Sequence, residues 1–348
     1  MKMFGIITTS DEIGLKGVPG FIYNKMPKAA KKELANLIIA NFKKNEYEYI
    51  DFSDIDIQAC VARLPFTQAQ LSIIKPTVMN KFCKEIIYRF KEQGIDYIVL
   101  PQHIRSNRDI YEKIYISGQF YYLQCKKLLM SLIIDILKKI CKIVGKDMTE
   151  IDIGIAENRF SQKSQILIQM LSVDTKYITF ITQDLAQAQG YMEKICDETG
   201  LTVRVSENIR KSLRNIDVIF VLDDFESFIK RTSIHPSTVV FNLDENASTE
   251  EQTNILKPII NIVIDSLDII IPQKIAAVVA PIKGLNKAEL VACIIALKKN
   301  KNIPTENVES YIEENKEFYN LGCKINALKG YGTPIDIHKL EKIVKNFS

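Results

Sequence analysis

The sequence contains few of the residues that build metal centres or disulfide frameworks. Its 348 residues include only three histidines, His103, His235 and His338, which stand far apart. Its seven cysteines include no Cys-x-x-Cys pair and no spacing typical of a zinc site. This cysteine usage excludes a disulfide scaffold and predicts reduced thiols in a cytoplasmic protein, and the scattered histidines predict no metal centre.

Excess charge and long apolar runs are also missing. The net charge of +4 is too small for a dedicated nucleic-acid binder. The most apolar runs are interrupted by Asp135, Asp265 and Asp268 before they reach the roughly 20 residues that a membrane span needs. The first ten residues lack a basic region followed by a long apolar stretch. We therefore expect no nucleic-acid partner, no membrane span and no secretion signal.

The composition that remains is that of a globular protein, with 47% hydrophobic and 25% charged residues. The length favours about two domains, because single cores rarely grow beyond roughly 250 residues. Charge is unevenly distributed. Residues 1–150 hold 23 basic and 16 acidic side chains, a net of +7, which leaves 23 basic and 26 acidic side chains, a net of −3, for the rest. An acidic partner would therefore meet the first half of the chain.

Residues 1–150 predict a mixed α/β domain for substrate or partner binding. A loop rich in glycine and proline, which contains Gly14, Gly17, Pro19 and Gly20, follows the first apolar run. Apolar runs and helical periodicity alternate along this half. The strands are expected at 3–8, 57–64 and 95–100, and the helices at 27–44, 77–94 and 121–144.

A more regular pattern begins at Ile151. Short apolar, β-branched runs alternate with helical stretches, which is typical of βαβ units and a parallel sheet covered on both faces. The strands are expected at 151–155, 176–182, 201–206, 217–222, 238–243 and 259–264. We therefore predict an α/β fold with a Rossmann-like doubly wound sheet at 151–275. A helical segment at 276–348, with helices at 286–299 and 305–321, is expected to pack on the N-terminal domain.

The turn after the first strand of that sheet is where a dinucleotide pyrophosphate would bind. Glycines at this turn let backbone N–H groups approach the phosphates. Here the three glycine positions are occupied by Asn158, Ser161 and Ser164. Two interpretations stay open: a modified anion site, since Asn tolerates tight turns and Ser can bind phosphate, or a Rossmann-like domain without a nucleotide.

Acidic residues follow two other strands of the sheet. Gln183 and Asp184 end the second strand, where Asp184 could bind a ribose or could simply cap the next helix. Asp223 and Asp224 follow the fourth strand in a crevice position. This pair could bind a metal or shift one another's pKa, and the alternative is a pair of solvated loop acids.

Three further features have a chemical interpretation. Cys293 lies near a predicted helix start, where a helix dipole can lower a thiol pKa, although its apolar neighbours also fit a buried structural thiol. Lys283, beside Gly284, could contact an anionic ligand. A group of lysines brackets the start of the first helix and could attract an acidic partner or merely solvate the helix: Lys25, Lys28, Lys31 and Lys32.

The order of several segments resembles the aldehyde-forming long-chain acyl-acyl-carrier-protein reductases and, more remotely, the two-domain fold of shikimate dehydrogenase and glutamyl-tRNA reductase. The likeness rests on the opening MFGII, the downstream Rossmann-like half and the segments Arg63–Pro65, Gly94–Leu100 and Tyr115–Gln119. It implies reduction of an acyl thioester with NADPH through a cysteine. The family's basic residue for NADPH matches Gln183, and its cysteine matches either Ala277, downstream of Ile271-Pro272, or the Ala292-Cys293 pair.

The leading hypothesis is a divergent NAD(P)-reductase-like protein with a degenerate nucleotide loop, acting on an acyl or similar thioester with Cys293 as its nucleophile. NADP and an acyl carrier protein are the cofactor and partner that this hypothesis implies. The alternative is a non-catalytic Rossmann-like homologue that binds a carrier protein or a partner enzyme. A third hypothesis is a nucleotide-free enzyme that uses the crevice at Asp223 and Asp224.

Overall fold

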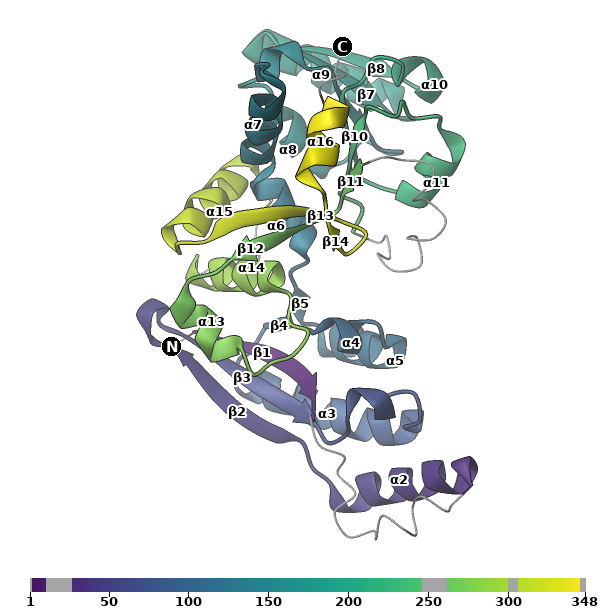
Figure 1. Cartoon of the computed structure of the whole chain (residues 1–348), viewed down its shortest axis with the longest axis vertical. Helices are drawn as coiled ribbons and strands as arrows, with labels where there is room; N and C mark the ends of the chain where they lie inside the picture. The colour runs from purple at the N-terminus through teal and green to yellow at the C-terminus, as the bar shows by residue number, and fades with distance from the viewer. Residues whose placement is uncertain (1, 11–26, 246–261, 300–305, 345–348) are drawn as a thin grey trace. The chain divides into compact units, whose positions relative to one another are not determined.

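The computed structural model of the chain describes residues 2–10, 27–245, 262–299 and 306–344. The chain divides into two compact units. Unit 1 contains residues 1–123 and 271–301, and unit 2 contains residues 124–270 and 302–348 (Figure 1). The glycine-rich loop expected at 14–20, Lys25, the side chain of Lys28 and the first residues of the strand expected at 259–264 lie outside the described residues.

Unit 1 is built on a five-stranded sheet with the order β2-β3-β1-β4-β5. Its strands are β1 (Lys2–Thr9), β2 (Glu46–Phe52), β3 (Ile57–Leu64), β4 (Tyr97–Val99) and β5 (Tyr121–Tyr122). All neighbours are parallel except β2, which pairs antiparallel with β3 at the edge. The parallel strands therefore run 2-1-3-4 in chain order, and the order reverses between β1 and β4 as in flavodoxin-like sheets.

The core of unit 1 lies between this sheet and α3 (Pro76–Glu92), with α2 (Lys28–Phe42) beside α3 (Figure 1). Proline occupies the first turn of α3, where a missing N–H costs nothing, and Gly94 follows the helix with a φ of +66°. The ring of Phe90 on α3 lies directly over Gly5 of β1, where a Cβ atom would collide with it. Glycine at this position therefore allows the helix to approach the sheet closely.

Two helices from late in the chain complete unit 1. The helix α13 (Gln273–Val279) packs on β2, and α14 (Lys287–Lys298) packs on β1 and β4. Glu289 of α14 is almost fully buried and forms an ion pair with Arg105. An ion pair of this kind leaves a buried charge uncompensated if either partner is lost, so it fixes α14 on unit 1.

Unit 2 contains a six-stranded sheet in which every pairing is parallel. Its order is β11-β10-β9-β6-β7-β8, and the strands are β6 (Ile153–Ala156), β7 (Tyr177–Ile181), β8 (Thr202–Ser206), β9 (Val218–Val221), β10 (Val239–Asn242) and β11 (Ile262–Ile264). Renumbered from β6, this order is 3-2-1-4-5-6, the strand order of the dinucleotide-binding Rossmann fold. The predicted α/β class and doubly wound sheet are confirmed.

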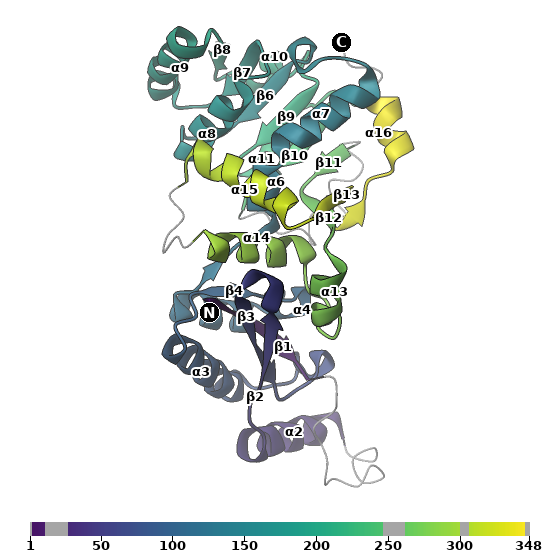
Figure 2. The same ribbon diagram turned by 90° about the vertical axis from the view of Figure 1, so that its left-hand side faces the viewer.

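Helices connect and cover this sheet. Among them are α8 (Gln162–Leu171), α9 (Leu185–Thr199), α10 (Ile209–Ser212) and α11 (Phe225–Arg231). In Figure 2, α7 (Ile133–Val144) crosses in front of the strands. The helix α16 (Ile337–Val344) packs on α7, and α15 (Val308–Asn320) packs on α8.

Some elements differ from the sequence expectations. The single helix expected at 121–144 is instead β5, α6 (Cys125–Ser131) and α7, because the helix breaks at Leu132. At this break the Ser131 hydroxyl donates to the Leu128 carbonyl, and the Ser131 carbonyl accepts from Asn315 of α15. Unit 2 also contains a smaller sheet that the sequence does not predict, formed by β12 (Ser266–Ile270), β13 (Lys324–Gly330) and β14 (Thr333–Pro334).

The unit boundaries also differ from the predicted domains. Residues 124–150 belong to unit 2, because α6 and α7 pack on α15 and α16. The segment expected to pack as one piece on the N-terminal domain is divided. Its first part, through residue 301, joins unit 1, and the remainder joins unit 2.

Candidate functional site

Each unit has a point at which its strand order reverses, and in open α/β sheets ligands bind outside the carboxyl ends of the strands at this point. In unit 2 the reversal lies between β6 and β9. The loop after β6 contains Asn158, Ser161 and Ser164, and the loop after β9 contains Asp223 and Asp224. The structure therefore brings these predicted site residues to one edge of the sheet.

Asn158 is bonded to the loops on both sides of it. Its backbone N–H donates to both carboxylate oxygens of Asp223, at 3.0 and 3.1 Å. Its carbonyl accepts from the Thr182 hydroxyl at 3.1 Å and from the Gln183 N–H at 3.3 Å. The loops after β6, β7 and β9 are thus joined to one another through a single residue.

The N-terminus of α8 is also satisfied by the protein's own groups. The Ser161 hydroxyl accepts from the N–H groups of Lys163 and Ser164, at 3.1 and 3.4 Å, and caps the helix. Glu157 lies against this cap, since it accepts from the Ser161 hydroxyl at 2.6 Å and from the Ser161 N–H at 3.1 Å. A carboxylate therefore sits where the helix end would otherwise attract an anion.

The carboxyl groups of Glu157 and Asp223 are both partly buried. Burial raises the pKa of Glu157, although the hydrogen bonds from Ser161 and Ser164 oppose this shift. Burial also raises the pKa of Asp223, with the neighbouring charges of Asp244 and Asp224 acting in the same direction. A pyrophosphate at this edge would meet these carboxylates and a loop N–H that is already bonded. The residues present do not fit a dinucleotide in the usual Rossmann manner.

The remaining residues predicted for this crevice are placed differently. Gln183 is exposed, and its backbone is bonded to Asn158. Asp184 occupies the N-cap position of α9, but its side chain makes no capping hydrogen bond. Asp224 is exposed at the start of α11 with a φ of +44°. Asp223 and Asp224 therefore do not act as a pair: one carboxylate is bonded to the neighbouring loop, and the other lies at the surface.

The predicted nucleophile lies in the middle of α14 in unit 1. Cys293 is 1% exposed, and burial raises its pKa well above the ordinary thiol range. Ala277, the other position that matches the family's cysteine, is exposed on α13. These surroundings are those of a structural thiol, and neither position offers an accessible sulfur.

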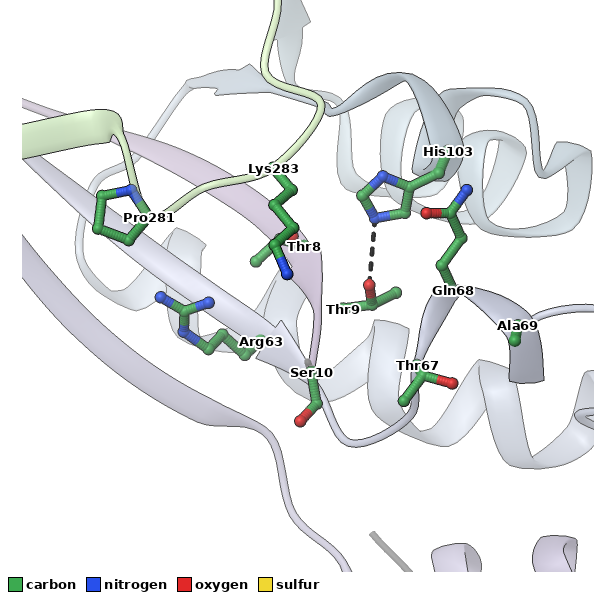
Figure 3. Close-up of a pocket in the computed structure, with 10 residues that line it drawn as sticks. All are labelled: Thr8, Thr9, Ser10, Arg63, Thr67, Gln68, Ala69, His103, Pro281 and Lys283. Carbon is green, nitrogen blue, oxygen red and sulfur yellow. Dashed lines mark hydrogen bonds between the residues drawn. The ribbon is translucent and has the colours of Figure 1, made fainter. Parts of the chain in front are cut away.

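Unit 1 has a cavity of about 200 Å³ at its own point of strand reversal (Figure 3). The carboxyl ends of adjacent parallel strands and the segments that follow them supply most of its lining. They contribute Thr8, Thr9 and Ser10 from β1, Arg63, Thr67, Gln68 and Ala69 from β3 and the segment after it, and His103 from α4 (Gln102–Arg105) after β4. Pro281 and Lys283 complete the lining.

Hydrogen bonds hold the parts of this cavity together. The Thr9 hydroxyl and Nε2 of His103 are hydrogen-bonded at 3.2 Å, which joins the end of β1 to α4 (Figure 3). The Gln102 N–H donates to the Gly284 carbonyl at 3.2 Å, which ties the segment of Lys283 to α4. Gly284 has a φ of +72°, and a Cβ atom on it would lie 3.4 Å from the His103 ring, so this position favours glycine.

The cavity is lined by positive and neutral polar groups. Arg63 and Lys283 supply the cations, and none of the ten described lining residues carries a carboxylate. Glu48 pairs with one nitrogen of Arg63 at 3.0 Å from outside the lining. Burial lowers the pKa of His103, so its imidazole is neutral at pH 7. Of these residues, the sequence pointed only to Lys283.

Two further observations concern the described ranges as a whole. None of the helices described is long and apolar enough to cross a membrane. Within the same ranges, no three His, Cys, Asp or Glu side chains are grouped so that they could hold a metal ion.

Of the predicted basic group, Lys32 is exposed and Lys31 is half-buried on α2.

No protein-family model matches the sequence, and no curated protein matches it. Shikimate 5-dehydrogenase from Listeria monocytogenes, solved with shikimate and NAD, has 11% identity and a TM-score of 0.29, over 91% of this chain and 96% of that one. L-tryptophan dehydrogenase from Nostoc punctiforme has 12% identity and a TM-score of 0.32, over 92% and 80%. Ornithine transcarbamoylase from Giardia lamblia has 8% identity and a TM-score of 0.31, over 74% and 77%.

Likenesses of this size carry no argument about activity. The fold assignment rests instead on the strand order and the parallel pairing of unit 2. The Rossmann-type fold that the sequence resemblance implies is therefore present. Reduction of an acyl thioester stays a hypothesis.

Proposed function

We propose that this protein has the architecture of a Rossmann-type reductase but works by binding rather than by nicotinamide-dependent reduction. One observation carries the proposal: Asp223 occupies the N–H of Asn158, in the loop where a dinucleotide's phosphates would need it. Glu157 supports the same conclusion at the start of α8. The loop is held by internal hydrogen bonds that a dinucleotide would have to break.

Electrostatic repulsion adds to this cost. Two like unit charges 4 Å apart repel by about 4 kcal/mol at an effective dielectric constant of 20. Micromolar binding corresponds to about −8 kcal/mol. A single uncompensated carboxylate beside a phosphate is therefore enough to remove a large part of the affinity that a reductase needs.

The direct test is a fluorescence titration of the full chain with NADPH and with NADH. We expect dissociation constants far weaker than micromolar for both nucleotides. A low-micromolar constant for either one would show that the carboxylates do not block the site, and the proposal would be wrong.

A pair of neighbouring variants sharpens the test. Asp223→Asn removes the charge but keeps an oxygen for the Asn158 N–H, and we expect it to raise nucleotide affinity at least about threefold. Asp224→Asn is the matched control, because it removes an adjacent exposed charge that does not contact Asn158 and because Asn tolerates its positive φ. Equal gains in both variants would assign the effect to overall charge and not to the loop.

The partner in this proposal is an acidic protein such as an acyl carrier protein, bound by the basic first half of the chain. The net of +7 over residues 1–150 and the exposed Lys32 on α2 support this choice. Charged contacts are screened over about 8 to 10 Å at physiological salt. We therefore expect binding of acyl carrier protein that weakens steeply with salt and with Lys32→Glu, whereas salt-independent binding or no binding would contradict the choice of partner.

A further inference from the structure

The cavity of unit 1 has the position and the composition of a ligand site. It lies outside the carboxyl ends of β3, β1 and β4, where the strand order of the sheet reverses. Its walls come from four separate segments of the chain. The Thr9–His103 and Gln102–Gly284 hydrogen bonds connect three of them, and the Ser10 N–H connects the fourth by donating to the Leu64 and Phe66 carbonyls. A surface depression between unrelated side chains would lack such connections.

The lining defines the charge of the ligand. Figure 3 shows the ammonium of Lys283 pointing into the space between Arg63 and Thr9, whereas the guanidinium of Arg63 lies near Pro281 and points away from Ser10. Arginine has five N–H donors, so its contact with Glu48 leaves others for a ligand. Charge-assisted hydrogen bonds from such groups to carboxylate or phosphate oxygens are the strong ones in protein sites.

The lining also limits the ligand's size and polarity. A cavity of about 200 Å³ corresponds to roughly seven waters at about 30 Å³ each. This volume lies below the roughly 300 to 1,000 Å³ of pockets that take drug-sized ligands, so the site suits a small ligand. The threonine hydroxyls and the neutral imidazole of His103 can both donate and accept, which suits a ligand with hydroxyl or carbonyl groups.

We propose that this cavity binds a small organic acid or phosphate ester, with its anionic group between Lys283 and Arg63 and its polar substituents at Thr9 and His103. All ten lining residues belong to unit 1, so the proposal does not depend on whether a dinucleotide binds to unit 2. Carboxylate and phosphate share the chemistry of recognition, and the experiment below distinguishes them.

The three histidines of the chain allow a direct test by NMR. We would follow their imidazole resonances in the full-length protein during titration with inorganic phosphate, with lactate and with glycerol as an uncharged control. Ionic strength is held constant with chloride, and the pH is held at about 7.5, above the ordinary histidine range. His235 and His338 are exposed internal controls.

We expect saturable movement of the His103 resonances with phosphate or lactate, and none with glycerol. Whichever anion binds more tightly identifies the class of ligand. If neither anion moves His103, or if all three histidines move together without saturation, the proposal is overturned.

Charge variants test the assigned anion contacts. Lys283→Gln and Arg63→Gln should each weaken binding of that anion by about ten- to a hundredfold, the range for a hydrogen bond to a charged group. Lys84→Gln removes an exposed charge on α3 of the same unit and should leave binding unchanged. Equal losses in all three variants would mean that the protein attracts anions only through its overall charge. The wild-type titration remains decisive if a variant fails to fold.

Discussion

The two units place polar residues at the same topological position and use them in opposite ways. At the β6–β9 reversal of unit 2, Asp223 accepts from the N–H of Asn158 and Glu157 accepts from Ser161, so these loop groups are bonded to one another. At the β1–β4 reversal of unit 1, hydroxyl groups and two cations surround a cavity. The point at which the strand order reverses thus indicates where a ligand can bind. Whether one binds there depends on whether the polar groups of the loops are already hydrogen-bonded to one another.

The electrostatics of the two edges differ in the same sense. In unit 2, burial raises the pKa values of Glu157 and Asp223, so their charged forms are disfavoured by the fold. In unit 1, burial lowers the pKa of His103, so its neutral form is favoured. The edge of unit 2 thus carries carboxylates whose charged forms are disfavoured by burial. At the edge of unit 1 the histidine is neutral, and the positive charges belong to Lys283 and Arg63.

The largest difference we expect is in thiol reactivity, because it compares an exposed cysteine of unit 2 with a buried cysteine of unit 1. Cys196 on α9 is exposed, whereas Cys293 is 1% exposed. Since burial can raise a pKa by several units, Cys293 in the native protein should be alkylated at least about a thousandfold more slowly. Pulse alkylation followed by mass spectrometry measures both rates.

Acyl donors give the second part of that experiment, with Cys293→Ala as the control for assignment. An acyl adduct at Cys293 would revive the thioester reductase hypothesis and would contradict the structural role that its burial indicates. Absence of the adduct under conditions that label an authentic reductase leaves that hypothesis without a nucleophile.

Charge reversal at the cavity should produce the next largest effect. Lys283→Glu places a carboxylate beside the anion, so affinity for the anion that binds the wild-type protein should fall by more than about a hundredfold. Lys283 is exposed, and the free energy of unfolding should change by less than about 0.5 kcal/mol. Anion binding that survives this change, measured by the His103 resonances, would remove Lys283 from the site.

The central strands of the two sheets offer a comparison of packing. Gly5 of β1 faces the rigid ring of Phe90, which is fully buried against Phe120. Gly154 of β6 faces the flexible end of Ile216, whose Cδ1 atom lies 2.6 Å from the point that a Cβ atom on this glycine would occupy. Gly5→Ala should therefore cost about 2 to 3 kcal/mol and Gly154→Ala less than about 1 kcal/mol, as measured by urea unfolding. Equal costs would show that the ring of Phe90 can move as easily as the Ile216 methyl group.

The smallest effect should be a pair of opposite pH dependences. The folded-state pKa of His103 is depressed, so its contribution to stability is present above about pH 6.5 and is lost as the pH falls. The folded-state pKa of Asp223 is raised, so its contribution is present below about pH 4 and is lost as the pH rises.

Urea unfolding between about pH 4 and pH 7.5 separates these contributions, which should each stay below about 1 kcal/mol. His103→Gln should reduce the loss of stability on acidification, and Asp223→Asn should reduce the loss on neutralisation. A change of the same sign in both variants would disagree with the pKa directions.

The sequence predicts the alternating elements of unit 2 well, because runs such as Ile151–Ile155 are short, apolar and bounded by helical patterns. It also locates Asn158, Ser161 and Ser164 at the decisive loop. Their use could not be predicted, because the Asn158–Asp223 contact joins residues 65 positions apart and depends on which strands become neighbours. The same dependence applies to Thr182, which contacts Asn158 across neighbouring strands, whereas Glu157 contacts Ser161 only four positions away and could be found from the local sequence.

The cavity of unit 1 was missed for a related reason. Its residues occur as separate polar groups at or just after the ends of three expected strands: Thr8 to Ser10, Arg63 with Thr67, and His103. The rule that the carboxyl ends of parallel strands meet at one edge is a signal that could have joined them. Lys283 reaches these residues only because the chain returns to unit 1 at residue 271, and no local sequence pattern predicts that return.

Because the chain returns to unit 1 late, the residues that line the cavity are synthesised at two different times. The β1, β3 and β4 loops of unit 1 are complete by His103, but Lys283 is added 180 residues later, after the whole sheet of unit 2. At about 5 to 20 residues per second the delay is roughly 10 to 40 seconds. During this interval β1 and β4 lack the cover of α14. A growing chain therefore carries an unfinished first unit while the six-stranded sheet of unit 2 is synthesised, and anion binding would report that the first unit is complete.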